Sequence, residues 1–262
     1  MNKQLDQDRG MTPDTGNEEL WAHVFGVGAA DLLDQRGFHS RLPSPPRCRL
    51  CKAPFKGLGG LYLRFKGKAR AKRNPNFCNA CDIFLENHPG GAEVPMSILY
   101  ADIRKSTEFV RTHPPAEVSR RTNKFLELAT HAITEADGFV VAFYGDCVVA
   151  NWPPGFSGEA YVQRAIETAQ LIAKASAEAD IPVGIGVHMG EAYMCSVEAA
   201  QGSFRDVSIF GEVVNLVARL SDAAGPGEVL VSAAAGDAVG LDGPEALFEL
   251  KGFDDAVRAR RL

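Results

Sequence analysis

The sequence lacks any long hydrophobic run. No apolar stretch in its 262 residues approaches the roughly 18 residues that a membrane-spanning helix needs. The N-terminal stretch MNKQLDQDRGMTPDTGNEEL also lacks the apolar core of a signal peptide. Hydrophobic residues are 45% of the chain and charged residues 23%, which is ordinary for a globular domain. We therefore expect a cytoplasmic protein with no membrane partner.

One segment lacks acidic residues altogether. Residues 46–75 contain ten Lys and Arg and no Asp or Glu, whereas the rest of the chain has 18 basic against 33 acidic residues. This segregation predicts two modules with different roles. The stretch KGLGGLYLRFKGKARAKRN, taken as a loop, has Tyr62 and Phe65 among its cations, as single-strand nucleic-acid surfaces do. A solvated face, or a patch that docks on the acidic remainder, is the favoured interpretation, so a nucleic-acid partner is not expected.

Disulfides are not expected in a reducing cytosol, so the six cysteines need another explanation. Four of them form two C-x2-C pairs that are 26 residues apart: Cys48, Cys51, Cys78 and Cys81. Two such pairs can supply four thiolates to one tetrahedral metal ion. This spacing predicts structural zinc, with iron or a redox dithiol as alternatives and the flanking His39 and His88 as substitute ligands. The other two, Cys147 and Cys195, fall in strand-like stretches and are expected in the core.

The chain divides into three parts by composition. A Pro-rich connector follows a polar N-terminus, and the Gly/Pro stretch NHPGGAE at 87–93 marks the next break. The parts are an N-terminal tail with a short helix at 1–45, a four-cysteine, zinc-ribbon-like basic module at 46–90 and a larger domain at 91–262. Residues 1–16 are polar and are expected to be disordered.

The larger domain alternates strand and helix patterns. Strands are predicted at 96–103, 139–144, 147–152, 181–189, 191–198 and 228–232, with two more near the C-terminus, and helices at 115–136, 158–178 and 211–223. This order predicts an α+β fold of the ferredoxin-like βαββαβ type, with a mainly antiparallel sheet and helices on one face.

Two carboxylates stand where strands end. Asp102 closes a strand, and Asp146 lies in the two-residue turn of the following hairpin. Each alone is explained by a helix cap or by turn chemistry. In a βαββ unit, however, the first strand and the hairpin are neighbours, so the two acids can face each other and bind divalent cations.

The residues after Asp102 favour an anion site. They begin a helix, whose free N–H groups attract phosphate, and they include Lys105, Ser106 and Thr107. Further along, Asn215 and Arg219 stand at i and i+4 on one face of an otherwise apolar helix. An Arg in such surroundings requires an anionic partner, either a substrate or an internal acid.

Taken together, residues 96–262 resemble the class III nucleotidyl cyclase catalytic domain, the adenylate and guanylate cyclase homology domain. Five pieces match in family order: LYADIRKST, DGFVVAFYGDCVVANW, VGIGVHMGEA, SIFGEVVNLVARL and ELKG. The resemblance implies a homodimer that converts a nucleoside triphosphate, ATP by default, to a 3′,5′-cyclic nucleotide and pyrophosphate. The site would lie between the subunits, with the two Asp residues from one chain and the Asn/Arg pair from the other.

The resemblance also implies a role for each matching residue. Asp102, Asp146 and the carbonyl of Ile103 would bind two Mg²⁺ or Mn²⁺ ions. Asn215 would position the ribose and Arg219 would stabilise charge at the α-phosphate. Lys251 would bind the terminal phosphates.

Three positions depart from the family pattern. The family often has Gly where Lys105 stands, so this residue either assists or restricts phosphate binding. The base-reading positions carry Ala142, where adenylate cyclases commonly have Lys, and Ser208, whose hydroxyl is compatible with adenine. A cyclase for GTP or a pyrimidine nucleotide is therefore an alternative. A second alternative is an inactive cyclase-like domain that dimerises or binds nucleotide beside a zinc-ribbon binding module.

Overall fold

A computed structural model describes residues 16–199 and 204–262. Residues 1–15, which hold most of the segment expected to be disordered, lie outside the described part. None of the described helices combines the length and the apolar character needed to cross a membrane.

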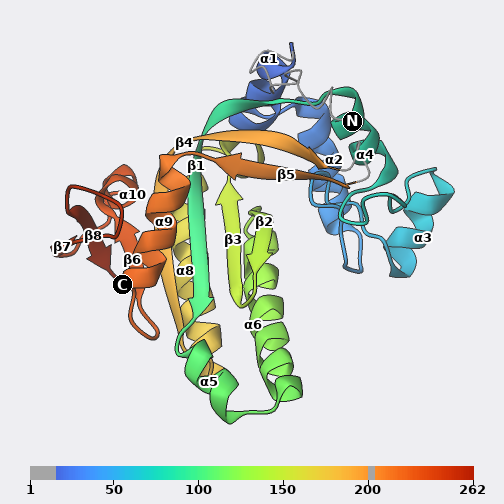
Figure 1. The fold of residues 1–262 in the computed structure, drawn as a ribbon. Coiled ribbons are helices and arrows are strands. Elements are labelled where there is room, and N and C mark those ends of the chain that lie inside the picture. Colours follow the sequence, from blue (N-terminus) through green and yellow to red (C-terminus); the bar gives the residue numbers. More distant parts are fainter. Residues whose placement is uncertain (1–15, 200–203) are drawn as a thin grey trace, which may run out of the picture.

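The N-terminal region is helical and holds the Cys-rich module (Figure 1). Its elements are α1 (Glu18–Trp21), the π-helix η1 (Ala22–Val27), α2 (Ala30–Arg41), α3 (Gly57–Phe65) and α4 (Asn79–Asn87). The expectation of a loop over the whole basic stretch was wrong, because α3 occupies its first half. Gly59 and Gly60 argue against a helix by propensity. In the fold they let α3 lie close to the backbone of Pro43 and Phe55, where a Cβ would approach to 2.4 and 2.6 Å.

The rest of the chain forms an eight-stranded sheet with helices packed on it, which confirms the predicted α+β fold class. In chain order its elements are β1 (Gly91–Ile103), α5 (Ser106–Thr112), α6 (Pro115–Glu135), β2 (Phe139–Tyr144), β3 (Cys147–Trp152), α7 (Pro154–Ser157), α8 (Tyr161–Glu178), β4 (Val183–Ala199), β5 (Phe204–Phe210), α9 (Glu212–Ala223), β6 (Val229–Ser232), α10 (Ala233–Ala238), β7 (Glu245–Phe248) and β8 (Val257–Arg261). The strand order is β2-β3-β1-β4-β6-β8-β7, with β5 paired to β4. Only the β4–β6 pair is parallel among the pairs of described strands.

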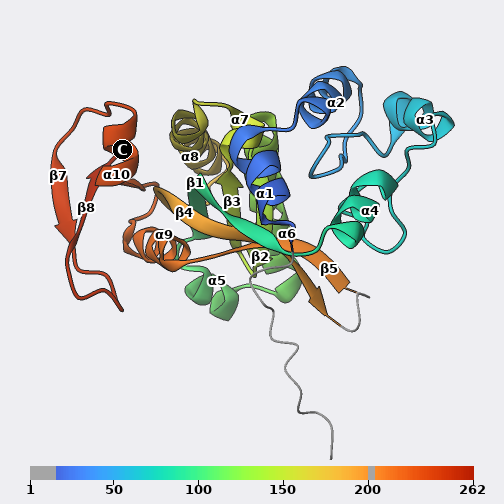
Figure 2. The same cartoon turned by 90° about the horizontal axis from the view of Figure 1, so that it is seen from above.

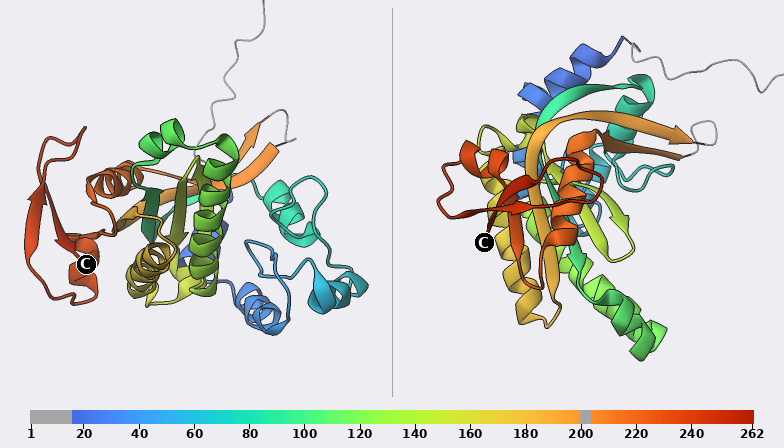
Figure 3. Two further views of the ribbon diagram at one scale, coloured as in Figure 1. Left: turned by 90° about the horizontal axis from the view of Figure 1, so that it is seen from below. Right: turned by 60° about the vertical axis from the view of Figure 1, so that its left-hand side comes forward.

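Helices cover both faces of the sheet, not one. In Figure 3, left, α6 and α8 lie on one side of the strands and α9 on the other. The alternation along β1 explains the division, because successive side chains point to opposite faces. Leu99 and Ala101 pack in the core with α6 and α8, whereas Ile98 packs in a second core with Val217 of α9.

Strand β1 is longer than the sequence pattern predicts. The Gly/Pro stretch at 87–93 suggests a break, yet β1 begins at Gly91 and pairs with β4 along its length. A Cβ at Gly91 would lie 2.3 Å from the Cβ of Cys195. Glycine at this position therefore permits close pairing with β4 and does not interrupt the strand.

The N-terminal region is fixed to the sheet domain through Asp137, which follows α6. Its carboxylate pairs with Arg36 of α2 at 3.3 Å, with Arg164 of α8 at 2.9 Å, and with Lys52, which follows Cys51. Burial alone raises the pKa of Asp137, but the hydrogen bond and charge of Lys52, with the two Arg, outweigh it and lower the pKa. One carboxylate thus joins α2, the first Cys pair and the sheet domain.

A second contact joins the Cys module to β5. Arg49, between Cys48 and Cys51, pairs with Asp206 of β5 at 3.4 Å. Asn74 donates a hydrogen bond to the backbone carbonyl of Arg205 on the same strand. Figure 1 shows β4 and β5 extending from the sheet toward this module.

Candidate active site

Asp102 and Asp146 are brought together by the pairing of β1 with β3. Asp102 is the partner of Cys147 in the antiparallel register, and Asp146 precedes Cys147 in the β2–β3 turn. Gly145 has a φ of 66°, which the turn requires and which glycine adopts without strain. Ile103, buried beside Asp102, is paired with Val183 of β4.

The electrostatics at this end of the β1–β3 strand pair, called here the β1–β3 edge, favour a bound cation. Burial, with the charge of Asp146, raises the pKa of Asp102 to about 6. Asp146 also has a buried carboxylate oxygen, Oδ2, without a hydrogen-bond partner among the described residues. Burial, with the charges of Asp102 and Asp146, raises the pKa of the Cys147 thiol to about 12, so it stays neutral and packs in the core. Two crowded acids and an unpaired buried oxygen fit the oxygen-ligand chemistry of Mg²⁺ or Mn²⁺.

Arg104 is a site residue that the sequence reasoning missed. Its Nη2 lies 3.9 Å from Oδ2 of Asp102 and donates to the carbonyls of Ser221 (2.7 Å) and Gly184 (3.3 Å). A Cβ at Gly184 would meet the guanidinium at 2.2 Å, so this glycine makes room for Arg104. The one feature of the sequence that could have indicated this role is the position of Arg104, two residues after a proposed metal ligand. Arg104 thus ties the first acid to β4 and to the C-terminal end of α9.

The turn after Asp102 begins helix α5. Lys105 precedes the helix with φ 58° and ψ 26°, the left-handed conformation. Ser106 is half-buried and Thr107 exposed in the first helical turn. The left-handed backbone explains why glycine suits this position in the family, because a side chain there is strained.

Replacing Lys105 with glycine is expected to raise the free energy of unfolding by about 1 kcal/mol, because glycine adopts the left-handed conformation freely. Urea denaturation of the wild type and the Lys105→Gly variant measures the change. Lys105→Ala is the matched control, since it removes the charge but keeps a Cβ, and its stability should stay near that of the wild type. A glycine variant less stable than the alanine variant would contradict this account of the turn.

Asn215, Arg219 and Lys251 line one surface hollow of about 440 Å³ between α9 and the segment that joins β7 to β8. Asn215 is exposed, and Arg219 pairs with Asp222 at 3.0 Å. Neither Asp102 nor any other residue of the β1–β3 edge lines this hollow. The described chain therefore presents the predicted residues as two separate groups.

The two positions predicted to read the base lie on strands that contact each other, β2 and β5. Ala142 is half-buried where the β2–β3 register shifts. Ser208 is half-buried on β5, opposite Cys195 of β4. Both positions carry small side chains, so neither can contact the base through a long cationic side chain such as that of Lys.

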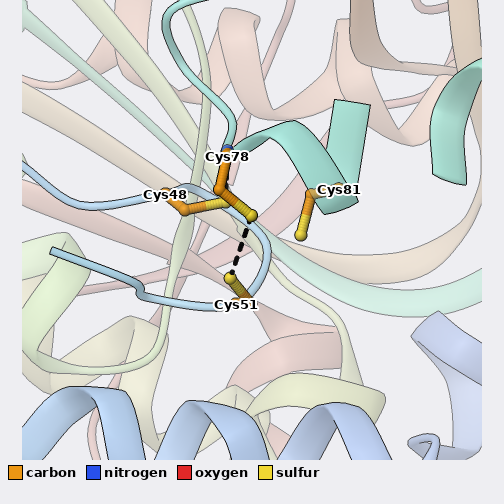
Figure 4. Close-up of side chains that lie close together, drawn as sticks. All are labelled: Cys48, Cys51, Cys78 and Cys81. Carbon is orange, nitrogen blue, oxygen red and sulfur yellow. Dashed lines mark hydrogen bonds between the residues drawn. The ribbon is translucent and has the colours of Figure 1, made fainter. Parts of the chain in front are cut away.

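The four cysteines of the N-terminal module form one buried cluster (Figure 4). Their sulfurs lie within 4.8 Å of one another, and the Cys51–Cys78 pair is 3.6 Å apart. A tetrahedral zinc with Zn–S bonds of about 2.3 Å separates its sulfurs by about 3.8 Å, so the cluster fits such an ion. Within the cluster, hydrogen bonding with Cys48 and the other two cysteines lowers the pKa of Cys51, whereas burial raises the pKa of Cys48. His39 contacts the Cys51 carbonyl through Nδ1 at 2.6 Å and is outside the ligand cluster.

Residues 92–253 match the family described as the adenylate and guanylate cyclase catalytic domain. An adenylate cyclase from Anabaena cylindrica is 31% identical over 135 residues, which cover 48% of this chain and 26% of that protein. An uncharacterized protein from Mycobacterium tuberculosis is 31% identical over 153 residues, covering 57% of this chain and 28% of that protein. The chain thus spans little more than a quarter of the length of these relatives.

Solved structures share the fold. The adenylyl cyclase CyaB from P. aeruginosa aligns with a TM-score of 0.59 at 20% identity, over 65% of this chain and 94% of that chain. The guanylyl cyclase Cya2 aligns with a TM-score of 0.61 at 21% identity, over 66% of this chain and 93% of that chain. At this identity the likeness establishes the fold and leaves the preferred base open.

Proposed function

The chain belongs to the adenylate and guanylate cyclase catalytic domain family, and from this premise we propose that it converts a nucleoside triphosphate to a 3′,5′-cyclic nucleotide and pyrophosphate for second-messenger signalling. The observation that carries the proposal is the pair of acids, Asp102 and Asp146, on neighbouring strand ends. Their shared burial and the unpaired Oδ2 of Asp146 support a divalent-cation site there.

Asp102, Asp146 and the Ile103 carbonyl would hold two Mg²⁺ or Mn²⁺ ions. Bound there, the ions would supply Lewis-acid activation of the ribose 3′-hydroxyl and neutralise charge on the phosphates. The chain's own contribution begins with Arg104, which fixes Asp102 relative to β4 and α9. Lys105, Ser106 and Thr107 would line the phosphate side at the start of α5.

A homodimer completes the site in this proposal. Asn215 and Arg219 occupy an exposed face of α9, in a hollow that contains no metal-site acid. Set against the β1–β3 edge of a second chain, Asn215 would orient the ribose and Arg219 would stabilise charge at the α-phosphate. Lys251, in the same hollow, would bind the terminal phosphates.

Mixing two inactive variants tests the composite site. Asp102→Ala removes a metal ligand from one half of each site, and Arg219→Ala removes the phosphate-binding cation from the other half. Each variant homodimer should therefore be inactive. Freely exchanging chains give half mixed dimers, each with one intact site, and activity should return to about a quarter of the wild-type value. Product formation by mass spectrometry measures the recovery.

The matched control mixes Asp102→Ala with Asp146→Ala, which spoil the same half. No exchange of chains can then restore a complete site, and activity should stay at background. Recovery in this control, or none in the first mixture once mixed dimers are detected, would contradict the shared site.

ATP is the substrate we propose by default. Ser208 offers a hydroxyl that suits adenine, and the Anabaena relative is an adenylate cyclase. Ala142 offers no polar group to the base, which keeps GTP and the pyrimidine nucleotides as competing substrates.

For the four-cysteine cluster we propose a structural zinc ion, with iron as the alternative metal. The short distances between the four sulfur atoms, and the burial of all four cysteines, support a closed site without room for substrate. Through Asp137 and β5 this site is joined to the sheet domain. Its proposed role is to orient or regulate the cyclase dimer.

A further inference from the structure

Helix α3 of the Cys module carries its large apolar side chains on the outside. Leu58, Leu61, Tyr62 and Phe65 have exposed fractions of 77%, 57%, 45% and 89%. Their spacing of i, i+3, i+4 and i+7 places them on one helix face. The opposite face, which packs on the module, consists of glycines and Leu63. Core packing therefore does not explain the apolar residues, and an exposed apolar face of this kind marks an interaction surface.

Cations surround this face. Lys56 precedes the helix, Arg64 lies in its last turn and Lys66 follows it, and all three are exposed. Within the described residues none of them forms an ion pair. Residues 46–75 include no acid that could neutralise them. The surface thus combines protruding apolar groups with unpaired positive charge.

The surface is accessible and extends beyond α3. The ring of Phe38 on α2, 48% exposed, lies 6.4 Å from that of Tyr62. Figure 1 and Figure 2 both show α3 at the outer edge of the molecule, on the side away from α9 and β7. A partner on α3 would therefore leave the face of α9 that carries Asn215 and Arg219 free.

We propose that this surface docks on an anionic phospholipid bilayer. The α3 surface comprises Phe38, Leu58, Leu61, Tyr62 and Phe65 with the cations Lys56, Arg64 and Lys66.

Interfacial amphipathic helices bind membranes this way, with the apolar groups in the acyl boundary and the cations on anionic head groups. The two exposed leucines favour lipid over nucleic acid, because aliphatic side chains offer no stacking surface for bases. The proposal replaces the expectation of no membrane partner with peripheral contact. It is independent of the proposed cyclase activity.

Sedimentation of the full chain with vesicles tests the proposal. We expect binding to vesicles that contain phosphatidylglycerol, little binding to phosphatidylcholine alone, and weaker binding as salt is raised. Leu61→Ser/Phe65→Ser should lower the partition coefficient at least about tenfold, because it removes buried apolar area. Lys56→Gln/Lys66→Gln should lower it by about tenfold or more on anionic vesicles.

The matched control is Leu171→Ser/Leu247→Ser, which makes the same kind of change at exposed leucines on α8 and β7. This variant should bind as the wild type does, and circular dichroism should show that all variants fold. The proposal is overturned if anionic vesicles do not bind the wild type, or if the α3 variants bind them equally well. Binding of single-stranded oligonucleotides through α3, without vesicle binding, also overturns it.

Discussion

The Asp102→Asn variant is expected to form cyclic nucleotide at least roughly 1000-fold more slowly than the wild type. The substitution keeps the shape of the side chain but removes the charge that a divalent cation needs. Asp146→Asn should have a comparable effect, because both acids lie at the same β1–β3 edge. The measurement is the initial rate of product formation with saturating Mn²⁺ and triphosphate.

A control separates loss of the site from loss of the fold. Asp242→Asn makes the same change at an exposed acid outside the site and should keep the wild-type rate. Thermal unfolding should show that Asp102→Asn is at least as stable as the wild type without metal, since it removes repulsion between two crowded acids. A stable Asp102→Asn variant that retains the wild-type rate would contradict the assignment of Asp102.

The Cys48→Ser/Cys51→Ser variant is expected to lose its metal and much of its stability. Structural zinc in small peptides contributes an apparent binding energy of roughly 10–16 kcal/mol, and two serines cannot replace two thiolates. Cys48 and Cys51 also belong to the same core cluster as Met96 and Ile98 of β1. Loss of the metal should therefore destabilise the sheet domain as well, with a fall in Tm of roughly 10 °C or more.

Elemental analysis and calorimetry measure these two effects. The wild type should contain about one zinc per chain, as a closed site of four thiolates binds. Cys195→Ala is the control, because Cys195 is buried in β4 outside the cluster and its loss should leave the zinc content unchanged. A wild type without zinc or iron, or a double variant that keeps its metal, would contradict the metal site.

Local sequence patterns predicted much of the sheet domain. The strands at 139–144 and 147–152 have the predicted bounds, because a two-residue Gly-Asp turn between alternating strands specifies a hairpin. That hairpin also allowed the approach of Asp102 and Asp146 to be predicted, since both lie at strand ends fixed by local pairing.

Tertiary contacts explain what the patterns missed. β4 is one strand of 17 residues, not the two predicted. Gly190 suggests a turn there, yet it lies in the strand under Val213 of α9, where a Cβ would approach to 2.6 Å. Helix α3 has the composition of a loop for a similar reason, since Gly59 and Gly60 on its buried face pack against the backbone of Pro43 and Phe55. Arg104 was missed because its partners come from β4 and α9.

Roles of single residues were harder to predict than their positions. The sequence left two opposite roles open for Lys105, and its left-handed backbone gives a structural reason for the family's glycine. The division of the chain at residues 45 and 90 stays a prediction, because the N-terminal region shares a core with β1. Cytoplasmic location and the identity of the metals likewise stay predictions.

One measurement tests the central claim most directly. The purified chain is incubated with Mn²⁺ and with ATP, GTP, CTP or UTP in turn, and products are identified by mass spectrometry. The proposed function predicts a 3′,5′-cyclic nucleotide and an equal amount of pyrophosphate, with ATP the favoured substrate and no product from Asp102→Asn. A dimeric, metal-loaded chain that makes no cyclic product from any of the four would contradict it and favour an inactive cyclase-like binding domain.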